Sequence, residues 1–172
     1  EKYHEDLIIC SACIAGEVPA KILKGDIAGA REACEWYHNL FGDDYYLELQ
    51  RHKVPDDPSL LANREAYELQ QKANKVLIEL SKEYGIKLVC TNDCHFEDKE
   101  TAEAHDHLLC IATGKDLDDP NRMRYSKQEW FKTRQEMNDV FSDIPEALSN
   151  TLEVLDKVEI YSIDHGPIMP FF

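Results

Sequence analysis

Two side chains able to bind a metal ion stand two positions apart near the middle of the chain. Asp93 and His95 follow residues 86–90, an apolar and β-branched run after Gly85 that predicts a short buried strand. In an extended backbone, residues i and i+2 point to the same side, so the carboxylate and the imidazole can converge on one point. Such an oxygen and nitrogen pair suits zinc, manganese or iron. The alternative interpretation is a capping Asp and a surface His in a strand–helix loop.

Two further strands are predicted at residues 7–10 and 45–50. Side chains at or just after their ends could bind the same metal ion as Asp93 and His95. The first is followed by Cys13, and the second carries Glu48 and is followed by His52. Active sites of α/β proteins gather at the carboxyl ends of parallel strands, and thiolate, imidazole and carboxylate together could hold a transition metal. Each residue also has a simpler interpretation. Cys13 could be a packed small hydrophobe, Glu48 could face solvent, and His52 could lie on a surface loop.

The helix expected after the third strand carries His105 and His107. Positions two apart on a helix point about 200° away from each other, so only one of them can face the site. We therefore consider His105 a possible site-lining residue. The chain has no P-loop spacing around Gly114 and no Gly-x-Ser-x-Gly elbow, which argues against a phosphate-binding loop and a serine hydrolase.

Strands and helices alternate along the chain. Helices are expected at about residues 17–24, at 27–41 with Asp26 as the N-cap, at 59–84 with Leu60 and Leu61 in its apolar stripe, at 99–112, and at 126–156 with a break around 142–145. Repeated βα units predict an α/β fold with a mainly parallel sheet. About three strands with several helices are too few for a closed barrel, so we expect a partial β/α barrel whose other strands lie upstream.

Composition narrows the class of protein. The chain has 172 residues, is 43% hydrophobic and 31% charged, and carries a net charge of −15, which disfavours a direct grip on nucleic acid. It has no apolar stretch of membrane-spanning length and no signal-peptide pattern, so a cytoplasmic location is expected. Most of the six cysteines read as reduced core residues, and Cys10-x-x-Cys13 lacks a second pair for a structural zinc site. The start without an initiator Met indicates an excised segment.

Several long sequence strings together resemble a known family. They are LELQRH at 47–52, VCTNDCHF at 89–96, AHDHLLCIATGK at 104–115, LDDPNR at 117–122 and FSDIPEAL at 141–148. In this order and spacing they resemble the PHP (polymerase and histidinol phosphatase) domain of bacterial replicative DNA polymerase III alpha subunits. The resemblance covers nearly the whole chain.

The resemblance implies a distorted, TIM-barrel-like β/α barrel with a metal cluster at the carboxyl ends of its strands. Asp93 and His95 match the last pair of the family's metal ligands, and Cys13 matches a thiol or imidazole ligand position. Glu48 and His52 match residues near the site, and no catalytic residue is assigned. The family's opening His-x-His element and its later His and Glu ligands have no counterpart here. We therefore expect residues 1–157 to be the C-terminal part of a PHP domain and 158–172 to be a linker toward a polymerase domain.

The resemblance also implies a function. The parent would be a DNA-directed DNA polymerase, a nucleotidyltransferase of DNA replication, and this fragment alone would be inactive. Its PHP region would act as a phosphoesterase with divalent ions (Zn, Mn or Mg) or serve a structural role. Its partners would be the rest of the alpha subunit and other replicase subunits, with DNA bound through the parent and no membrane contact.

Two rival functions stay open. The first is a free-standing PHP phosphoesterase such as histidinol phosphatase, although residues 117–122 and the helices of 126–156 match the polymerase version. The second is an interaction scaffold that binds no metal.

Overall fold

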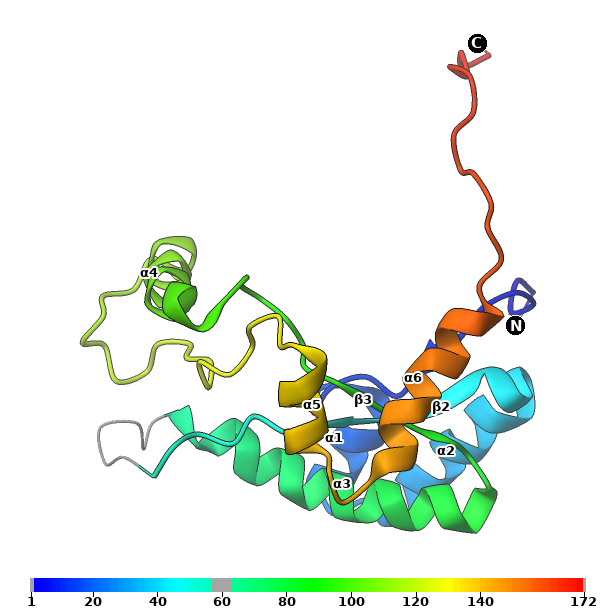
Figure 1. The fold of residues 1–172 in the computed structure, drawn as a ribbon, viewed down its shortest axis with the longest axis horizontal. Helices are drawn as coiled ribbons and strands as arrows, with labels where there is room; N and C mark the ends of the chain where they lie inside the picture. Colours follow the sequence, from blue (N-terminus) through cyan, green and yellow to red (C-terminus); the bar gives the residue numbers. More distant parts are fainter. Residues whose placement is uncertain (1, 57–62, 172) are drawn as a thin grey trace.

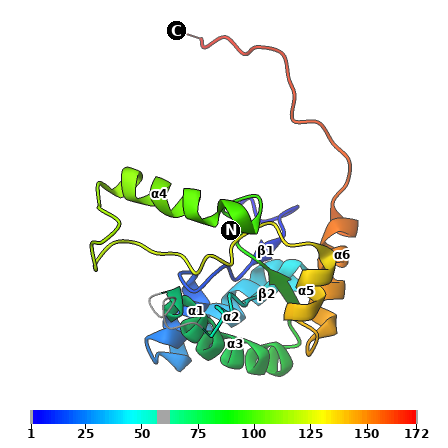
Figure 2. The same cartoon turned by 60° about the vertical axis from the view of Figure 1, so that its left-hand side comes forward.

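The computed structural model describes residues 2–56 and 63–171, and it shows a three-stranded parallel sheet with helices packed around it (Figures 1 and 2). In chain order the elements are β1 (Ile9–Cys10), α1 (Glu17–Leu23), α2 (Ile27–Phe41), the 3-10 turn η1 (Gly42–Asp44), β2 (Tyr45–Gln50), α3 (Glu65–Tyr84), β3 (Leu88–Thr91), the 3-10 turn η3 (Lys99–Thr101), α4 (Ala102–Thr113), α5 (Arg134–Val140) and α6 (Pro145–Lys157). The predicted α/β class and the three parallel strands are confirmed. Within the described residues the sheet is open, and no barrel is formed.

The register of the sheet brings the strand ends to one edge. β2 lies in the middle, with Ile9 of β1 opposite Tyr45 and with Leu47 and Gln50 opposite Leu88 and Thr91 of β3. All pairs are parallel, so the carboxyl ends of β2 and β3 adjoin. The loops that follow these two strands therefore begin side by side.

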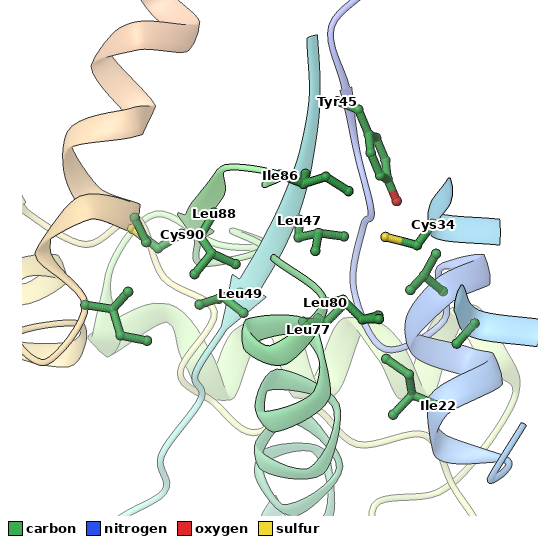
Figure 3. Packing of buried hydrophobic residues seen from close by; sticks show 14 of the residues in the cluster. Ile22, Cys34, Tyr45, Leu47, Leu49, Leu77, Leu80, Ile86, Leu88 and Cys90 are labelled. Atoms are coloured by element: carbon green, nitrogen blue, oxygen red, sulfur yellow. The ribbon is translucent and has the colours of Figure 1, made fainter. Parts of the chain in front are cut away.

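One hydrophobic cluster joins the sheet to its helices (Figure 3). Leu47 and Leu49 of β2 pack with Leu77 and Leu80 of α3, and all four side chains are buried. Residues of α1, α2, β3 and α6 complete the cluster, among them Ile22, Cys34, Leu88, Cys90 and Ala147. Five of the six residues of β2 are buried, so this central strand is covered on both faces rather than half exposed.

Local signals explain most helix ends. Asp26 caps α2 by accepting a 2.9 Å hydrogen bond from the Gly29 amide, as expected from its position. Gly85 ends α3 with φ of +70°, a conformation that glycine adopts without a steric penalty. Pro145 opens α6, which confirms the predicted break between the last two helices.

Several predicted boundaries are corrected. The last helical region begins at Arg134 rather than at residue 126, because residues 126–131 contact the loop after β3 instead. The helix expected from residue 59 begins at Glu65, while Leu60 and Leu61 of its predicted stripe lie outside the described residues. The outer strands are shorter than predicted, since β1 covers Ile9–Cys10 and β3 starts at Leu88.

Two parts of the chain lie apart from the core. α4 and the loop after it stand away from the sheet (Figures 1 and 2), and α4 contributes no residue to the hydrophobic cluster. Residues 158–171 are exposed and have no helix or strand, in agreement with the irregular segment predicted there. Across residues 2–56 and 63–171, no helix combines the length and apolar character needed to cross a membrane.

The cysteines are unpaired thiols. Cys34, Cys90 and Cys110 are buried, as predicted, whereas Cys10 and Cys94 are exposed and Cys13 is half-buried.

Candidate functional site

Asp93 and His95 lie together in the loop of residues 92–96, directly after β3. Their side chains are 39% and 31% exposed, and Asp93 Oδ1 lies 4.0 Å from His95 Nδ1. Asp93 has φ of +46°, so the extended geometry expected for this pair is wrong. The two side chains converge because the backbone turns back at Asp93, not because a strand continues through it.

The hydrogen bonds of His95 define its tautomer. Nδ1 lies 2.7 Å from the Asp93 carbonyl oxygen, which can only accept, so Nδ1 carries the proton. The lone pair is then on Nε2, which accepts from the Tyr125 hydroxyl at 3.1 Å. Burial and the nearby carboxylates of Asp93 and Glu129 raise the pKa of Tyr125, which keeps this hydroxyl protonated. A histidine that donates from Nδ1 to a backbone carbonyl is oriented to bind a metal through Nε2.

His105 faces the same side chains from α4. Its ring centre lies 5.8 Å from that of His95 and 5.2 Å from those of Tyr125 and Phe96. His107 is exposed, and its Nδ1 donates to the Glu103 carbonyl within its own helix. The two histidines of α4 therefore point differently, and His105 is the one beside His95.

Glu48 lies on the sheet, where it binds its neighbours. Its Oε1 accepts from the Thr91 hydroxyl of β3 and from the side-chain NH₂ of Gln50 at 3.1 Å. Its own backbone N–H donates to the Ser11 hydroxyl at 2.8 Å. Cys13 and Glu48 line the same small cavity beside α3, together with Gln50, Gln70 and Asn74. The structure thus brings Cys13 close to Glu48, in a cavity whose lining also includes the apolar residues Ile14 and Leu77.

His52 is a buried residue with both ring nitrogens engaged, and only 2% of it is exposed. Nδ1 contacts the Gln70 side-chain amide at 3.0 Å, and Nε2 contacts the Asn92 carbonyl oxygen at 3.0 Å. Burial lowers the pKa of His52, with the nearby Glu129 carboxylate opposing that effect. His52 is therefore a neutral imidazole beneath the loop of residues 92–96 and has no lone pair free for a ligand.

Three residues near the site were not found from the sequence: Asn92, Tyr125 and Glu129. Only 2% of Glu129 is exposed, and its Oε1 atom lies 3.3 Å from Nδ1 of His52. Its only sequence signal is a Ser-x-x-Glu spacing with Ser126, which usually marks a helix start. Asn92 and Tyr125 have no local signal, because their roles depend on contacts with distant segments.

The described residues do not complete a metal site on their own. Within residues 2–56 and 63–171, no group of three or more His, Cys, Asp or Glu side chains is arranged to hold a metal ion. Asp93 and His95 have the right chemistry for two donors, and the Asn92 Oδ1 atom is a buried acceptor with no partner in this part of the chain. The donor set therefore fits one side of a site that needs further ligands.

Comparisons with known proteins show which family this chain resembles. Residues 1–52 match the PHP domain family. The chain is 38% identical over 172 residues to the DNA polymerase III subunit alpha of Borreliella burgdorferi, across 99% of its length. The subunits of Campylobacter jejuni and Escherichia coli are 39% and 35% identical, across 100% and 91% of the chain. The predicted resemblance to the PHP region of DNA polymerase III alpha subunits is confirmed.

The chain spans only a small part of these relatives. It covers 14% of the length of the Borreliella and Campylobacter subunits and 12% of that of Escherichia coli. The PHP match includes Cys13, Glu48 and His52, whereas Asp93 and His95 lie beyond it, in the region that the polymerase relatives cover.

Proposed function

We propose that this chain forms part of the PHP region of a replicative DNA polymerase alpha subunit. The whole protein would carry out DNA-templated nucleotidyl transfer in the cytoplasm. The observation that carries the proposal is the similarity to polymerase alpha subunits across 91–100% of the chain. Residues 1–157 would be the C-terminal part of the PHP domain and 158–172 a linker, with the open sheet completed to a distorted barrel by strands from outside the chain.

Within this region, Asp93 and His95 would each donate one ligand to a divalent cation, with Cys13 as a further candidate ligand. Support comes from the convergence of the first two side chains and from the tautomer of His95, whose Nε2 lone pair is available once the Tyr125 hydroxyl moves aside. Glu48 and His105 would line the site. His52 would support the loop from below without binding the ion, since both of its nitrogens are engaged.

A bound divalent cation such as Zn, Mn or Mg would lower the pKa of a water molecule and clamp phosphoryl oxygens, as phosphoester hydrolysis requires. The chain's own contribution is to orient two donors on a supported loop at the edge of the sheet. The remaining ligands would come from the rest of the alpha subunit. The isolated chain is accordingly expected to show weak or no phosphoesterase activity.

The partners proposed for the region follow from its charge. A net charge of −15 disfavours contact with the phosphate backbone, so DNA would be bound by other parts of the polymerase. The rest of the alpha subunit and other replicase subunits would be the direct protein partners.

A structural role without metal is the second candidate. It is favoured by one observation, namely that the Tyr125 hydroxyl already hydrogen-bonds to Nε2 of His95, the nitrogen that would bind a metal. In that case the region would serve to stabilise the polymerase.

Metal content of the full-length protein separates the two roles. We expect Asp93→Asn and His95→Ala each to lower the bound divalent metal by about tenfold or more at limiting metal. His107→Ala is the matched control, because this exposed histidine bonds only within α4 among the contacts observed. Metal content unchanged by both site substitutions would contradict the ligand assignment and support the structural role. Primer extension by the full-length protein tests the polymerase proposal separately.

A further inference from the structure

The loop of residues 92–96 needs support from outside itself. Asp93 is a non-glycine residue with φ of +46°, in the left-handed region that costs most residues free energy. Such a conformation persists only where surrounding contacts hold it. The contacts that hold this loop show which residues place Asp93 and His95 together.

Most of these contacts come from residues 126–131, which we call the support segment. The Glu129 carbonyl accepts from the His95 amide at 2.8 Å, and Phe96 pairs with Trp130 in a parallel bridge. The side-chain amide of Asn92 donates to the carbonyls of Gln128 and Trp130, at 2.9 and 2.7 Å. The support segment thus binds the loop on both sides of Asp93.

The support segment is itself held by the carboxylate of Glu129. Oε1 accepts from the Ser126 amide at 3.0 Å and from the Ser126 hydroxyl at 2.6 Å, and Oε2 accepts from the Gln128 amide at 2.9 Å. Lys127, between these partners, has φ of +63°. The carboxylate therefore closes a turn that backbone hydrogen bonds do not close, and hydrogen bonds to a charged acceptor are the strong ones.

We infer that Glu129 is a positioning residue, whose buried carboxylate shapes the support segment so that it holds Asp93 and His95 together. The importance of that placement for metal binding rests on the proposed function, but the placement itself does not. Glu129 does not act as a ligand here, because both of its oxygens accept hydrogen bonds from the support segment and 2% of the residue is exposed.

A second Ser/Thr-x-x-Glu motif, close to Ser126 and Glu129 in the chain, provides a matched control. Thr133 and Glu136 have the same Ser/Thr-x-x-Glu spacing, and Glu136 accepts from the Thr133 amide and hydroxyl at 2.7 and 2.8 Å. This second pair opens α5 and makes none of the contacts to the loop described above. Glu136→Gln thus removes a comparable carboxylate without removing the support.

Amide hydrogen exchange in the 172-residue chain tests the inference. In Glu129→Gln the side-chain NH₂ can face the Gln128 amide, two donors in opposition, so the turn should open. We expect exchange of the His95 and Phe96 amides to become about tenfold faster, with exchange in β2 and α3 unchanged. Ser126→Ala keeps the carboxylate and removes the two hydrogen bonds of the Ser126 hydroxyl, one donated to Glu129 and one accepted from the Gln128 amide. It should give a smaller increase at the same amides, because both carboxylate oxygens still accept from backbone amides. Glu136→Gln should leave them within about twofold of the unsubstituted chain.

A purely global effect would give a different pattern. If Glu129→Gln and Ser126→Ala speed exchange in β2 and α3 as much as at His95, the carboxylate serves general stability and the inference is overturned. The inference is also overturned if the His95 amide exchanges at the same rate in Glu129→Gln as in Glu136→Gln. Cobalt(II) titration of the full-length protein, monitored by visible absorption, then tests the proposed function independently. If cobalt gives no signal even with the loop intact, the metal proposal fails while the positioning role stands on the exchange data.

Discussion

The side-chain amide of Gln70 determines which ring nitrogen of His52 carries the proton. Gln70 Oε1 accepts from the His52 backbone amide at 2.8 Å, so its Nε2 must be the group that donates to His52 Nδ1 at 3.0 Å. His52 Nε2 is then protonated and donates to the Asn92 carbonyl at 3.0 Å. One neutral imidazole therefore connects α3, the end of β2 and the candidate site loop.

This arrangement predicts a loss of stability on mild acidification. Burial lowers the pKa of His52 below its ordinary value of 6.5 in the folded chain. Below pH 6.5 the unfolded chain therefore takes up a proton that the folded chain resists. The free energy of unfolding should fall as the pH drops from about 6.5 toward the folded pKa, by at most about 1.4 kcal/mol per pH unit. Urea unfolding at pH 7.5 and pH 5.5 measures the difference.

The control for this prediction is an exposed histidine. His52→Gln should reduce the pH dependence between these two values, whereas His165→Gln in the exposed C-terminal segment should not. An identical pH dependence in His52→Gln and the unsubstituted chain would show that His52 is not the responsible group.

Two adjacent tyrosines at the start of β2 should respond oppositely to loss of their hydroxyl groups. Tyr46 is fully buried, and its hydroxyl donates to Glu153 of α6 at 2.6 Å. The hydroxyl of Tyr45 is buried without a hydrogen-bond partner. We expect Tyr46→Phe to lower the free energy of unfolding by about 1–2 kcal/mol, and Tyr45→Phe to leave it unchanged or raise it by up to about 1 kcal/mol. Urea unfolding of both variants at pH 7.5 makes the comparison.

The charge state of Glu153 explains why the Tyr46 hydrogen bond should be strong at this pH. Lys87 and the Tyr46 hydroxyl lower the pKa of Glu153 to about 2, so the acceptor is a carboxylate. Equal effects of the two Tyr→Phe substitutions would contradict the difference between their hydroxyl groups.

The loop after α4 is held by Asp106 and Arg122. Two hydrogen bonds of 2.6 and 2.8 Å join the guanidinium to the carboxylate, and each side chain is less than 10% exposed. Because α4 adds nothing to the hydrophobic cluster, Arg122→Ala should loosen this loop without changing the cooperative unfolding of the core. We expect cleavage of residues 114–125 by a nonspecific protease to become about tenfold faster, with little change in the unfolding midpoint.

Arg134→Ala removes an exposed arginine at the start of α5 and serves as the control. If Arg122→Ala lowers the midpoint of core unfolding as strongly as it raises cleavage, then α4 and the core unfold as one unit.

The sequence predicted the strands of the sheet, and it predicted those helix ends that depend on interactions between neighbouring residues. Asp26 and Gly85 end their helices as expected, since a side-chain cap and a left-handed glycine act within a few residues. β2 was predicted from an alternating pattern at residues 45–50, and β3 from a short apolar run. These elements depend on neighbours in sequence, so one chain without an alignment is enough to locate them.

Residues 126–136 show that a local sequence pattern does not always determine the local structure. Ser126–Glu129 and Thr133–Glu136 carry the same helix-start spacing, yet only the second opens a helix. In the first, the carbonyls of Gln128 and Trp130 are taken by Asn92, and Trp130 pairs with Phe96. Those partners are more than 30 positions away, and no local pattern reveals them. The same holds for the turn at Asp93, which brings the candidate ligands together by a route that strand geometry did not suggest.

The conformation of Asp93 allows stability to be separated from metal binding. At φ of +46°, glycine is unstrained, Asp and Asn are tolerated, and alanine is unfavourable. We expect Asp93→Gly to leave the free energy of unfolding unchanged or slightly higher, Asp93→Asn to be close to neutral, and Asp93→Ala to lower it by about 1 kcal/mol. Urea unfolding measures this order in the 172-residue chain.

All three substitutions remove the same carboxylate, so the ligand proposal predicts equal losses of bound metal in the full-length protein despite unequal stabilities. Asp93→Gly is the decisive variant, because it keeps or relaxes the turn that places His95. Metal lost by Asp93→Ala but retained by Asp93→Gly would mean that the backbone conformation, and not the carboxylate, is what the site requires.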